Sequence, residues 1–299
     1  MVELGRVLTA MVTPFDEGLA VDYAQAGALA RALVASGSDG LVVTGTTGEN
    51  PALEAEENQR LWAAVKEAVG GSATVIAGSG TNGTGETIRL SRAAAEAGAD
   101  ALLLVVPYYN KPTQEGLYRH FKAVADSTPL PCILYNVPGR TIVNMSAETT
   151  LRLAHEVPNI VGIKEASGDF AQMARIIAGA PEGFRVWSGN DTDTFGLLCL
   201  GGYGVVSVTS HLIGRQIQRL IALVLEGRVE EAAAEHQRQL ALSQGLFVVS
   251  NPIPVKYALN RVGLRVGGLR LPLVEADAAT AAFLDELLAG YAIDLPVGA

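Results

Sequence analysis

The sequence is poor in cysteine and in charge. Only two of its 299 residues are cysteines, Cys132 and Cys199, and both lie in apolar runs. We therefore expect buried free thiols rather than a disulfide framework. Charged residues make up 18% of the chain, below the roughly 25% usual for soluble domains. A surface with so little charge favours an oligomer, in which subunits cover part of one another.

Positive charge is scarcer still. Against 31 acidic residues there are 22 Lys and Arg, so the net charge is −9, and no basic block occurs. This argues against a nucleic-acid partner. No stretch approaches the roughly 20 apolar residues of a membrane span. The segment Met1–Arg6 has no long apolar run behind a basic start, so we expect no signal peptide, no membrane partner and a cytoplasmic location.

Several signatures of catalytic chemistry are missing too. The four histidines are His120, His155, His211 and His236, and none joins Cys, Asp or Glu at a metal-ligand spacing. We therefore expect no metal site. Neither a G-x-S-x-G elbow nor a Walker loop occurs.

What the chain does contain is a regular alternation of apolar runs and helical stretches, with 49% apolar residues. Short β-rich runs predict eight strands: Val7–Val12, Gly40–Thr44, Thr74–Ala77, Ala101–Val106, Cys132–Asn136, Ile160–Lys164, Arg185–Ser188 and Val205–Thr209. Between them, helices are expected at Tyr23–Ala35, Glu54–Val69, Glu86–Ala97, Gln114–Asp126, Ala147–His155, Asp169–Ile177 and Asp193–Cys199.

A repeated strand–helix unit predicts a parallel sheet, because parallel neighbours need a crossover. Eight units can close into a (β/α)8 TIM barrel, and an open doubly wound sheet is the structural alternative. From about residue 212 the strand signal stops. Helices are expected there at Ile213–Leu225, Val229–Val248, Pro254–Arg261 and Ala276–Leu288. We therefore predict a catalytic barrel over residues 1–225 and a C-terminal helical appendage over 226–299 that packs on it.

Reactive side chains gather at the ends of the predicted strands. The strand ends carry Thr44–Glu49, Pro107–Lys111, Leu134–Arg140, Gly162–Glu165 and Ser188–Asn190. In a barrel, the carboxyl ends of the strands converge on one mouth, where active sites lie.

Lys164 is the only one of five lysines within an apolar strand. Alternation places it on the same face as Gly162, which would leave room beside the lysine stem. In the lumen, burial would disfavour the ammonium form, and a neutral amine can attack a ketone to form an imine. The alternative is a structural lysine paired with Glu165.

Tyr135 has matching parity on the preceding strand, about 4.8 Å away. It could meet Lys164 and carry protons, although a core tyrosine with a satisfied hydroxyl is the commoner case. Thr46 and Thr47 could hold a carboxylate, or simply form a turn and helix cap. Arg140, expected in a loop, is either a carboxylate clamp or a solvated side chain.

Two further motifs stay open. Tyr108 and Tyr109 lie beyond a strand and could be surface or interface aromatics. The segment Gly78–Gly83 matches the dinucleotide fingerprint G-x-G-x-x-G, which would make the protein an NAD-dependent oxidoreductase. It lies in the third strand–helix unit rather than the first, so we discount it.

Together the motifs resemble the pyruvate-dependent class I aldolase family that includes the dihydrodipicolinate synthases and N-acetylneuraminate lyase. The resemblance runs from about residue 7 to 272, on Val12-Thr-Pro14, Gly45–Glu49, Pro107–Asn110, Tyr135–Pro138, Gly162–Ala166, Gly201–Val208 and Asn251–Lys256. It implies a barrel enzyme without cofactor that forms a Schiff base with pyruvate.

The resemblance also implies roles for individual residues. Lys164 is similar to the imine-forming lysine and Tyr135 to the proton shuttle. Thr46 is similar to a link to a second tyrosine, Tyr109, which in the family reaches into the neighbouring subunit. The substrate-binding positions are Thr47 for the pyruvate carboxylate, Arg140 for the aldehyde's carboxylate, and Gly189 and Val206 beside the imine.

Arg140 favours a synthase, which condenses pyruvate with L-aspartate 4-semialdehyde, over a lyase. A 2-keto-3-deoxy acid aldolase is the alternative within the family, and a non-catalytic sensor of a small acid is another. The resemblance further implies lysine biosynthesis by the diaminopimelate route and a homotetramer built as a dimer of dimers.

Regulation is where the chain departs from the family pattern. Asn82, Glu86 and Tyr108 match the site at which lysine-inhibited relatives bind L-lysine. However, Asn50, Pro51, Ala55 and Asn58 stand where sensitive relatives often carry Ser, Ala and two His. We therefore expect weak or absent inhibition by L-lysine.

Overall fold

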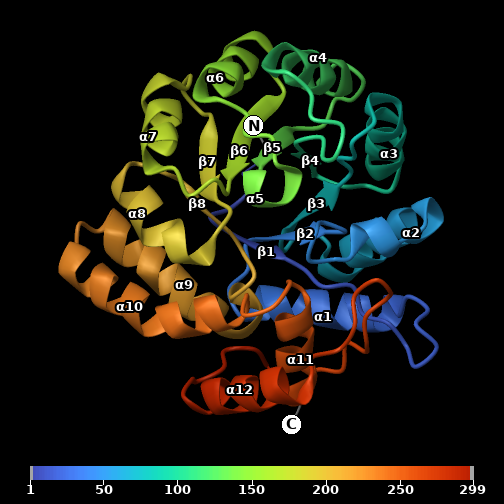
Figure 1. The fold of residues 1–299 in the computed structure, drawn as a ribbon, viewed down its shortest axis with the longest axis vertical. Coiled ribbons are helices and arrows are strands. Elements are labelled where there is room, and N and C mark those ends of the chain that lie inside the picture. The colour runs from blue at the N-terminus through green and yellow to red at the C-terminus, as the bar shows by residue number, and fades with distance from the viewer. Residues whose placement is uncertain (1–2, 297–299) are drawn as a thin grey trace.

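The computed structural model describes residues 3–296. Within them eight parallel strands pair in chain order, and β8 pairs back with β1, which closes the barrel (Figure 1). The strands are β1 (Val7–Ala10), β2 (Gly40–Val43), β3 (Thr74–Gly78), β4 (Ala101–Val105), β5 (Cys132–Asn136), β6 (Ile160–Glu165), β7 (Arg185–Ser188) and β8 (Gly204–Ser207). The predicted TIM barrel is confirmed, and the open sheet is excluded.

Helices surround this barrel in the described part of the chain. They are α1 (Tyr23–Ala35), α2 (Ala55–Val69), α3 (Thr84–Glu96), α4 (Gln114–Ala125), α5 (Pro138–Thr141), α6 (Ala147–Glu156), α7 (Phe170–Gly179), α8 (Thr194–Cys199), α9 (Ser210–Leu225), α10 (Val229–Gly245), α11 (Ile253–Arg261) and α12 (Ala278–Ala289). Short 3-10 turns lie at Asn50–Ala52 and Asp191–Asp193.

Many helices begin where a short polar side chain caps the first turn. Asp22, Thr113, Ser146 and Asp169 each accept a hydrogen bond from the backbone N–H three residues on, at the starts of α1, α4, α6 and α7. These caps fix where each crossover helix starts. They therefore also fix how far each loop extends over the barrel mouth.

The pairing of β5 with β6 contains an irregularity. Cys132 lies opposite Ile160, but Ile133 lies opposite Gly162, so the pairing skips Val161. Beyond this point the register is regular and places Tyr135 directly opposite Lys164.

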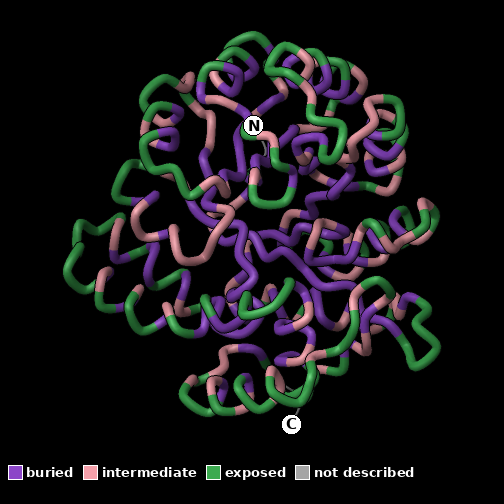
Figure 2. Tube along the Cα trace, viewed as in Figure 1, coloured by how far each residue is buried: buried purple, intermediate pink, exposed green. Residues whose placement is uncertain are grey.

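The strands and the inner faces of the helices form the main buried core, whereas the outer helix faces are exposed (Figure 2). The C-terminal helices share that core through Leu242, Leu246, Val255 and Leu288. Helix α10 packs on α9, and α12 packs on α11. The division into a barrel and a C-terminal appendage from residue 226 stays a proposal. Residues 1–2 and 297–299 of these two predicted regions lie outside the described residues.

Two smaller predictions concern the cysteines and membrane-spanning helices. Neither cysteine is in a disulfide, and Cys132 is buried as expected. Cys199 is exposed, contrary to expectation, because it ends the short helix α8 on its solvent side. No helix within residues 3–296 is long and apolar enough to cross a membrane.

Candidate active site

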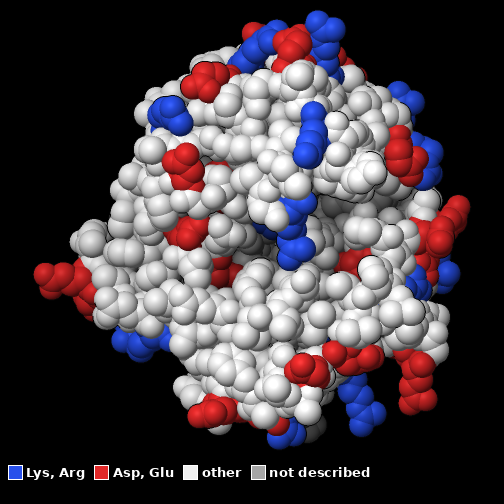
Figure 3. Space-filling model, in the orientation of Figure 1, with Lys and Arg blue, Asp and Glu red and all other residues white. Residues whose placement is uncertain are grey.

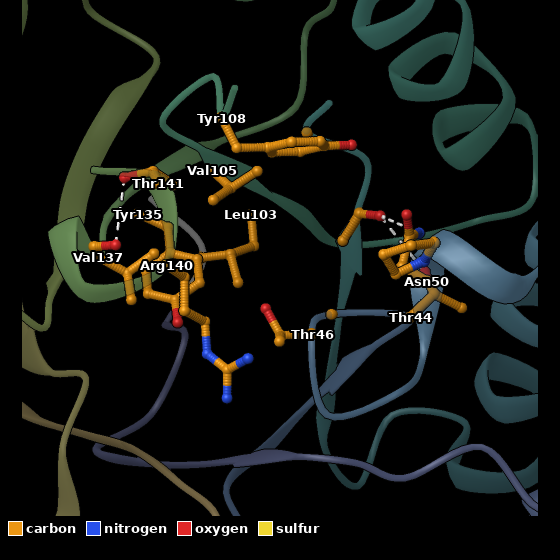
Figure 4. Close-up of a pocket in the computed structure, with 14 residues that line it drawn as sticks. Thr44, Thr46, Asn50, Leu103, Val105, Tyr108, Tyr135, Val137, Arg140 and Thr141 are labelled. Carbon is orange, nitrogen blue, oxygen red and sulfur yellow. Dashed lines mark hydrogen bonds between the residues drawn. The ribbon is translucent and has the colours of Figure 1, made fainter. Parts of the chain in front are cut away.

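A cavity of about 210 Å³ opens at the mouth of the barrel. Its lining includes Thr46, Tyr108, Tyr135 and Arg140, four of the residues predicted from the sequence. In Figure 4 the Arg140 guanidinium and the Thr46 hydroxyl face one open space beside the Tyr135 ring, and Tyr108 lies across it. On the face shown in Figure 3, a central hollow lies beside basic side chains, with acidic side chains also near it.

Lys164 points into the barrel. Its side chain is buried, with the residue 7% exposed, and its Nζ lies 4.1 Å from the centre of the Tyr135 ring. Among residues 3–296 the amine makes no ion pair or hydrogen bond. The predicted meeting of Lys164 with Tyr135 is therefore confirmed.

Glu165, the alternative partner of Lys164, points the opposite way. Its fully buried carboxylate accepts hydrogen bonds from Asn136 Nδ2 at 3.0 and 3.1 Å, from the Ser167 backbone at 2.8 Å and from Gln172 Nε2 at 3.2 Å. Burial raises the pKa of this carboxyl group, while the donors oppose that rise. Glu165 thus fastens β6 to β5 and α7 and leaves Lys164 without a counterion.

The space left by Gly162 is used differently from our expectation. A Cβ at this position would lie 2.6 Å from the Trp187 ring and 2.4 Å from the Arg185 carbonyl oxygen. The glycine therefore admits Trp187 and strand β7 rather than the stem of Lys164. Parity alone could not reveal this, because it gives no size for the cross-strand neighbour.

The loop after β2 carries both candidate threonines. Thr46 faces the cavity, but no hydrogen bond joins it to Tyr135 within the described residues. Thr47 is buried, and its Oγ1 accepts a hydrogen bond of 2.9 Å from Asn251 Nδ2. At the loop's end Glu49 forms a fully buried ion pair of 2.8 Å with Lys256.

Arg140 does not lie in a loop as expected. It is the third residue of the one-turn helix α5, which Pro138 begins with its φ already suited to a helix. Four residues are too few for a periodic pattern, so this turn could not be predicted from the sequence. The turn exposes Arg140 at the cavity, and no described residue forms a salt bridge with it.

Tyr109 is not part of this cavity. It is 91% exposed and has a φ of +73°, a conformation that non-glycine residues rarely adopt. Its neighbour Tyr108 lines the cavity.

The other two residues of the predicted regulatory site make local contacts. The Asn82 carbonyl oxygen accepts a hydrogen bond from the Asn110 side chain, and Glu86 pairs with Arg89 at 2.6 Å. That pairing lowers the pKa of Glu86.

Gly189 and Val206 lie at the neighbouring strands β7 and β8, and neither is among the residues that line the cavity. Gly189 follows β7, and its N–H donates to the Glu165 carbonyl oxygen at 2.7 Å. A Cβ here would lie 2.5 Å from that of Ala166, so only glycine fits. Val206 is 1% exposed in β8.

The glycines of the dinucleotide-like segment have a packing role. A Cβ at Gly78 would lie 2.4 Å from the Thr44 carbonyl oxygen, and one at Gly80 would lie 2.4 Å from the Val105 amide nitrogen. The absence of side chains lets β3 pack closely against its neighbours at the mouth. This accounts for both glycines without a nucleotide.

Sequence reasoning assigned no role to Asn251, Lys256 or Asn136. Asn251 and Lys256 belong to a segment quoted for its resemblance, so the signal was present, but their partners lie about 200 residues away in the chain. Within residues 3–296, no three His, Cys, Asp or Glu side chains gather as a metal-binding group.

The chain is similar to known proteins over almost its whole length. A model of the dihydrodipicolinate synthetase family matches residues 3–289. A Dehalococcoides mccartyi protein named 4-hydroxy-tetrahydrodipicolinate synthase is 59% identical over 99% of this chain and 100% of its own length. A protein of the same name from Symbiobacterium thermophilum is 58% identical over 97% of this chain and 98% of its own.

Solved structures are similar throughout. The dihydrodipicolinate synthase DapA-2 of Bacillus anthracis has a TM-score of 0.95 and 44% identity, and the match covers 98% of this chain and all of that one. The enzyme of Cyanidioschyzon merolae, solved with lysine bound, has a TM-score of 0.94 and 48% identity over 96% of this chain and 98% of that one.

Proposed function

Because this chain belongs to the dihydrodipicolinate synthetase family, we propose that it condenses pyruvate with L-aspartate 4-semialdehyde, the 4-hydroxy-tetrahydrodipicolinate synthase reaction of lysine biosynthesis. The observation that carries the proposal is the buried amine of Lys164, which lies beside Tyr135 without an ion-pair partner among residues 3–296. An amine in such a place can attack a keto acid.

The proposed reaction runs through an imine. Lys164 Nζ adds to the keto carbon of pyruvate, water leaves, and the imine loses a methyl proton to give an enamine. The enamine carbon attacks the aldehyde. The amine of the semialdehyde then displaces Lys164 and closes the ring. Tyr135 carries protons during these steps.

Binding roles follow from position. Thr47 is proposed to hold the pyruvate carboxylate, with Gly189 and Val206 beside the imine. Arg140, exposed at the cavity without a salt-bridge partner in the described chain, suits the carboxylate of the aldehyde substrate. A 2-keto-3-deoxy acid aldolase would use Lys164 and Tyr135 alike. It would not need Arg140 to bind an aldehyde carboxylate, and the two curated relatives carry the synthase name.

Reductive trapping tests the proposal directly. Borohydride with pyruvate should leave a pyruvate adduct on Lys164, located by peptide mass mapping. Lys164→Ala and Lys164→Arg should both abolish it, since arginine offers no neutral amine. Lys122→Ala, at an exposed lysine, is the control and should trap normally. An intact Lys164 peptide after trapping would refute the mechanism.

Assembly is proposed as a homotetramer, a dimer of dimers. The 91% exposed Tyr109 supports it, because in a family-like assembly this ring would enter the site of a neighbouring subunit and join Thr46 and Tyr135. Sedimentation should give four subunits, and Tyr109→Ala should lower kcat.

A cytoplasmic location is likewise proposed from the sequence.

Regulation by L-lysine is proposed to be weak or absent, although Asn82, Glu86 and Tyr108 match the regulatory site. Asn50 Nδ2 donates to Asn58 Oδ1 at 3.4 Å and to the Gly78 carbonyl oxygen at 3.2 Å. These two side chains therefore bond to each other and to the backbone after β3. Initial rates measured over a lysine titration should change little. Half-inhibition in the sub-millimolar range would contradict this.

A further inference from the structure

The side chain of Asn251 reaches the candidate carboxylate-binding loop from the far end of the chain. It precedes α11, is 5% exposed, and donates from Nδ2 to Thr47 Oγ1 over 2.9 Å. Its Oδ1 is buried without a hydrogen-bond partner in the described chain. The bond to Thr47 is therefore the one hydrogen bond of the Asn251 amide group in residues 3–296.

This bond has a direction. An amide N–H can only donate, so it occupies a lone pair of the threonine oxygen and leaves the hydroxyl proton to be donated elsewhere. A substrate carboxylate can only accept. The Thr47 hydroxyl has a single proton, which it can donate to a carboxylate only if no neighbouring acceptor takes it. Asn251 leaves that proton available, because it donates to the Thr47 oxygen. An oxygen that accepts a hydrogen bond is also a stronger donor.

The two segments are held together beside this bond. Lys256 of α11 forms the 2.8 Å ion pair with Glu49, and both side chains are essentially fully buried. The Arg270 backbone donates to the other Glu49 oxygen at 3.0 Å. Thr13 Oγ1 donates to the Gly48 carbonyl oxygen at 2.6 Å. The place of Asn251 relative to Thr47 is therefore fixed by contacts other than its own.

We propose that Asn251 is a positioning residue, which orients the Thr47 hydroxyl as a donor to the carboxylate of the keto acid. This inference rests on the proposed function. It assigns the C-terminal region a part in binding the first substrate, through a side chain that does not itself touch the substrate.

The test is the pyruvate concentration that gives half-maximal borohydride trapping. Asn251→Ala should raise it roughly fivefold to thirtyfold, the effect of one hydrogen bond. Thr47→Val should do the same, and the double variant should add nothing further, because both changes remove one interaction. The KM for the aldehyde should stay within twofold.

A second variant separates orientation from packing. Asn251→Asp keeps the shape but offers only acceptors, so the Thr47 hydroxyl would have to donate to it. A merely structural role predicts a milder effect than that of Asn251→Ala, and the positioning role predicts a larger one that shrinks in the Thr47→Val background. Asn159→Ala is the matched control. Its amide bonds to three backbone carbonyls remote from Thr47, so its loss should leave half-saturation unchanged.

The outcomes distinguish the two proposals. Failure of the unaltered protein to trap pyruvate on Lys164 would overturn the proposed function and this inference with it. Normal trapping with the same half-saturation in the Asn251 variants, or additive effects with Thr47→Val, would overturn the positioning role alone.

Discussion

Lys164 and Lys256 are both buried, yet they differ in their partners. Lys256 faces Glu49 at 2.8 Å and the Phe15 ring at 4.2 Å, whereas Lys164 lies over the Tyr135 ring and has no ion-pair partner among residues 3–296. Burial lowers the pKa of Lys256, and the Glu49 carboxylate opposes only part of that fall. The contact with Glu49 gives Lys256 a structural role. Burial by itself therefore does not identify a nucleophile, and the missing counterion is the informative feature.

The two cysteines allow a prediction at the same scale. Cys132 is buried in β5, and burial raises the pKa of its thiol to about 12, so it should be inert in the native protein. Cys199 is exposed at the end of α8. We expect a thiol-specific reagent to modify one cysteine quickly and the second only after unfolding. Peptide mapping should locate the fast reaction at Cys199, and rapid labelling of Cys132 would contradict the fold.

Individual residues also show what a sequence can reveal. Lys164 was predictable, because a lone lysine in an apolar strand is chemically conspicuous. The surroundings of Gly162 were not, since the size of a cross-strand neighbour depends on register. Asn251 was not either, because no local pattern links it to Thr47, 204 residues away.

At the scale of elements, the predicted strands all appeared with boundaries within a few residues. Apolar runs and flanking turn residues define short buried strands well. The one-turn helix α5 was missed, for lack of length. The skipped pairing at Val161 was missed as well, because the alternation of side chains does not show which residue has no partner on the neighbouring strand.

The Glu165 cluster leads to a prediction for the junction of β5, β6 and α7. All its contacts within the described chain come from donors, and Asn136 cannot turn over, because its Oδ1 accepts from the Met145 backbone at 3.0 Å. Glu165→Gln would place an N–H group against another donor. We expect the free energy of unfolding to fall by about 1–3 kcal/mol, the cost of an unsatisfied buried polar group.

Denaturant titration measures this change. The matched control is Glu115→Gln, at an exposed carboxylate that pairs with Arg119 and Arg152, and its effect should be much smaller. Equal losses in the two variants would show that the buried cluster adds nothing special.

For the whole molecule, acid stability follows from buried histidines. His211 is fully buried; its Nε2 accepts from the Val12 N–H at 3.2 Å and its Nδ1 donates to the Val208 carbonyl oxygen at 2.8 Å, so the ring is fixed as neutral. Burial lowers the pKa of His211 from 6.5 to about 4, and that of His120 likewise.

The sign follows from proton counts. Between pH 6.5 and 4 the unfolded chain binds more protons at these two positions than the native protein does, so their contribution to stability is lost as pH falls. Each histidine should cost about 2 kcal/mol between pH 8 and pH 5.

Unfolding measured across this range should show the loss, and His211→Gln should reduce its slope. His155→Gln, at an exposed histidine, is the control and should leave the slope unchanged. A slope that is the same in all three proteins would rule out the explanation.

The skipped residue at Val161 has a consequence for how this kind of catalyst can arise. Side chains of a strand alternate between the two sides of the sheet, so a shift of one residue moves each of them to the other side. If the pairing that starts at Cys132 and Ile160 continued without interruption, Tyr135 would lie opposite Ile163, and the phenol and the amine would end on different sides. The extra residue, Val161, brings the Tyr135 phenol and the Lys164 amine to the same side of the sheet. The contact between Tyr135 and Lys164 at the mouth of the barrel thus depends on the number of residues at the start of β6, toward the opposite end of that strand from Lys164.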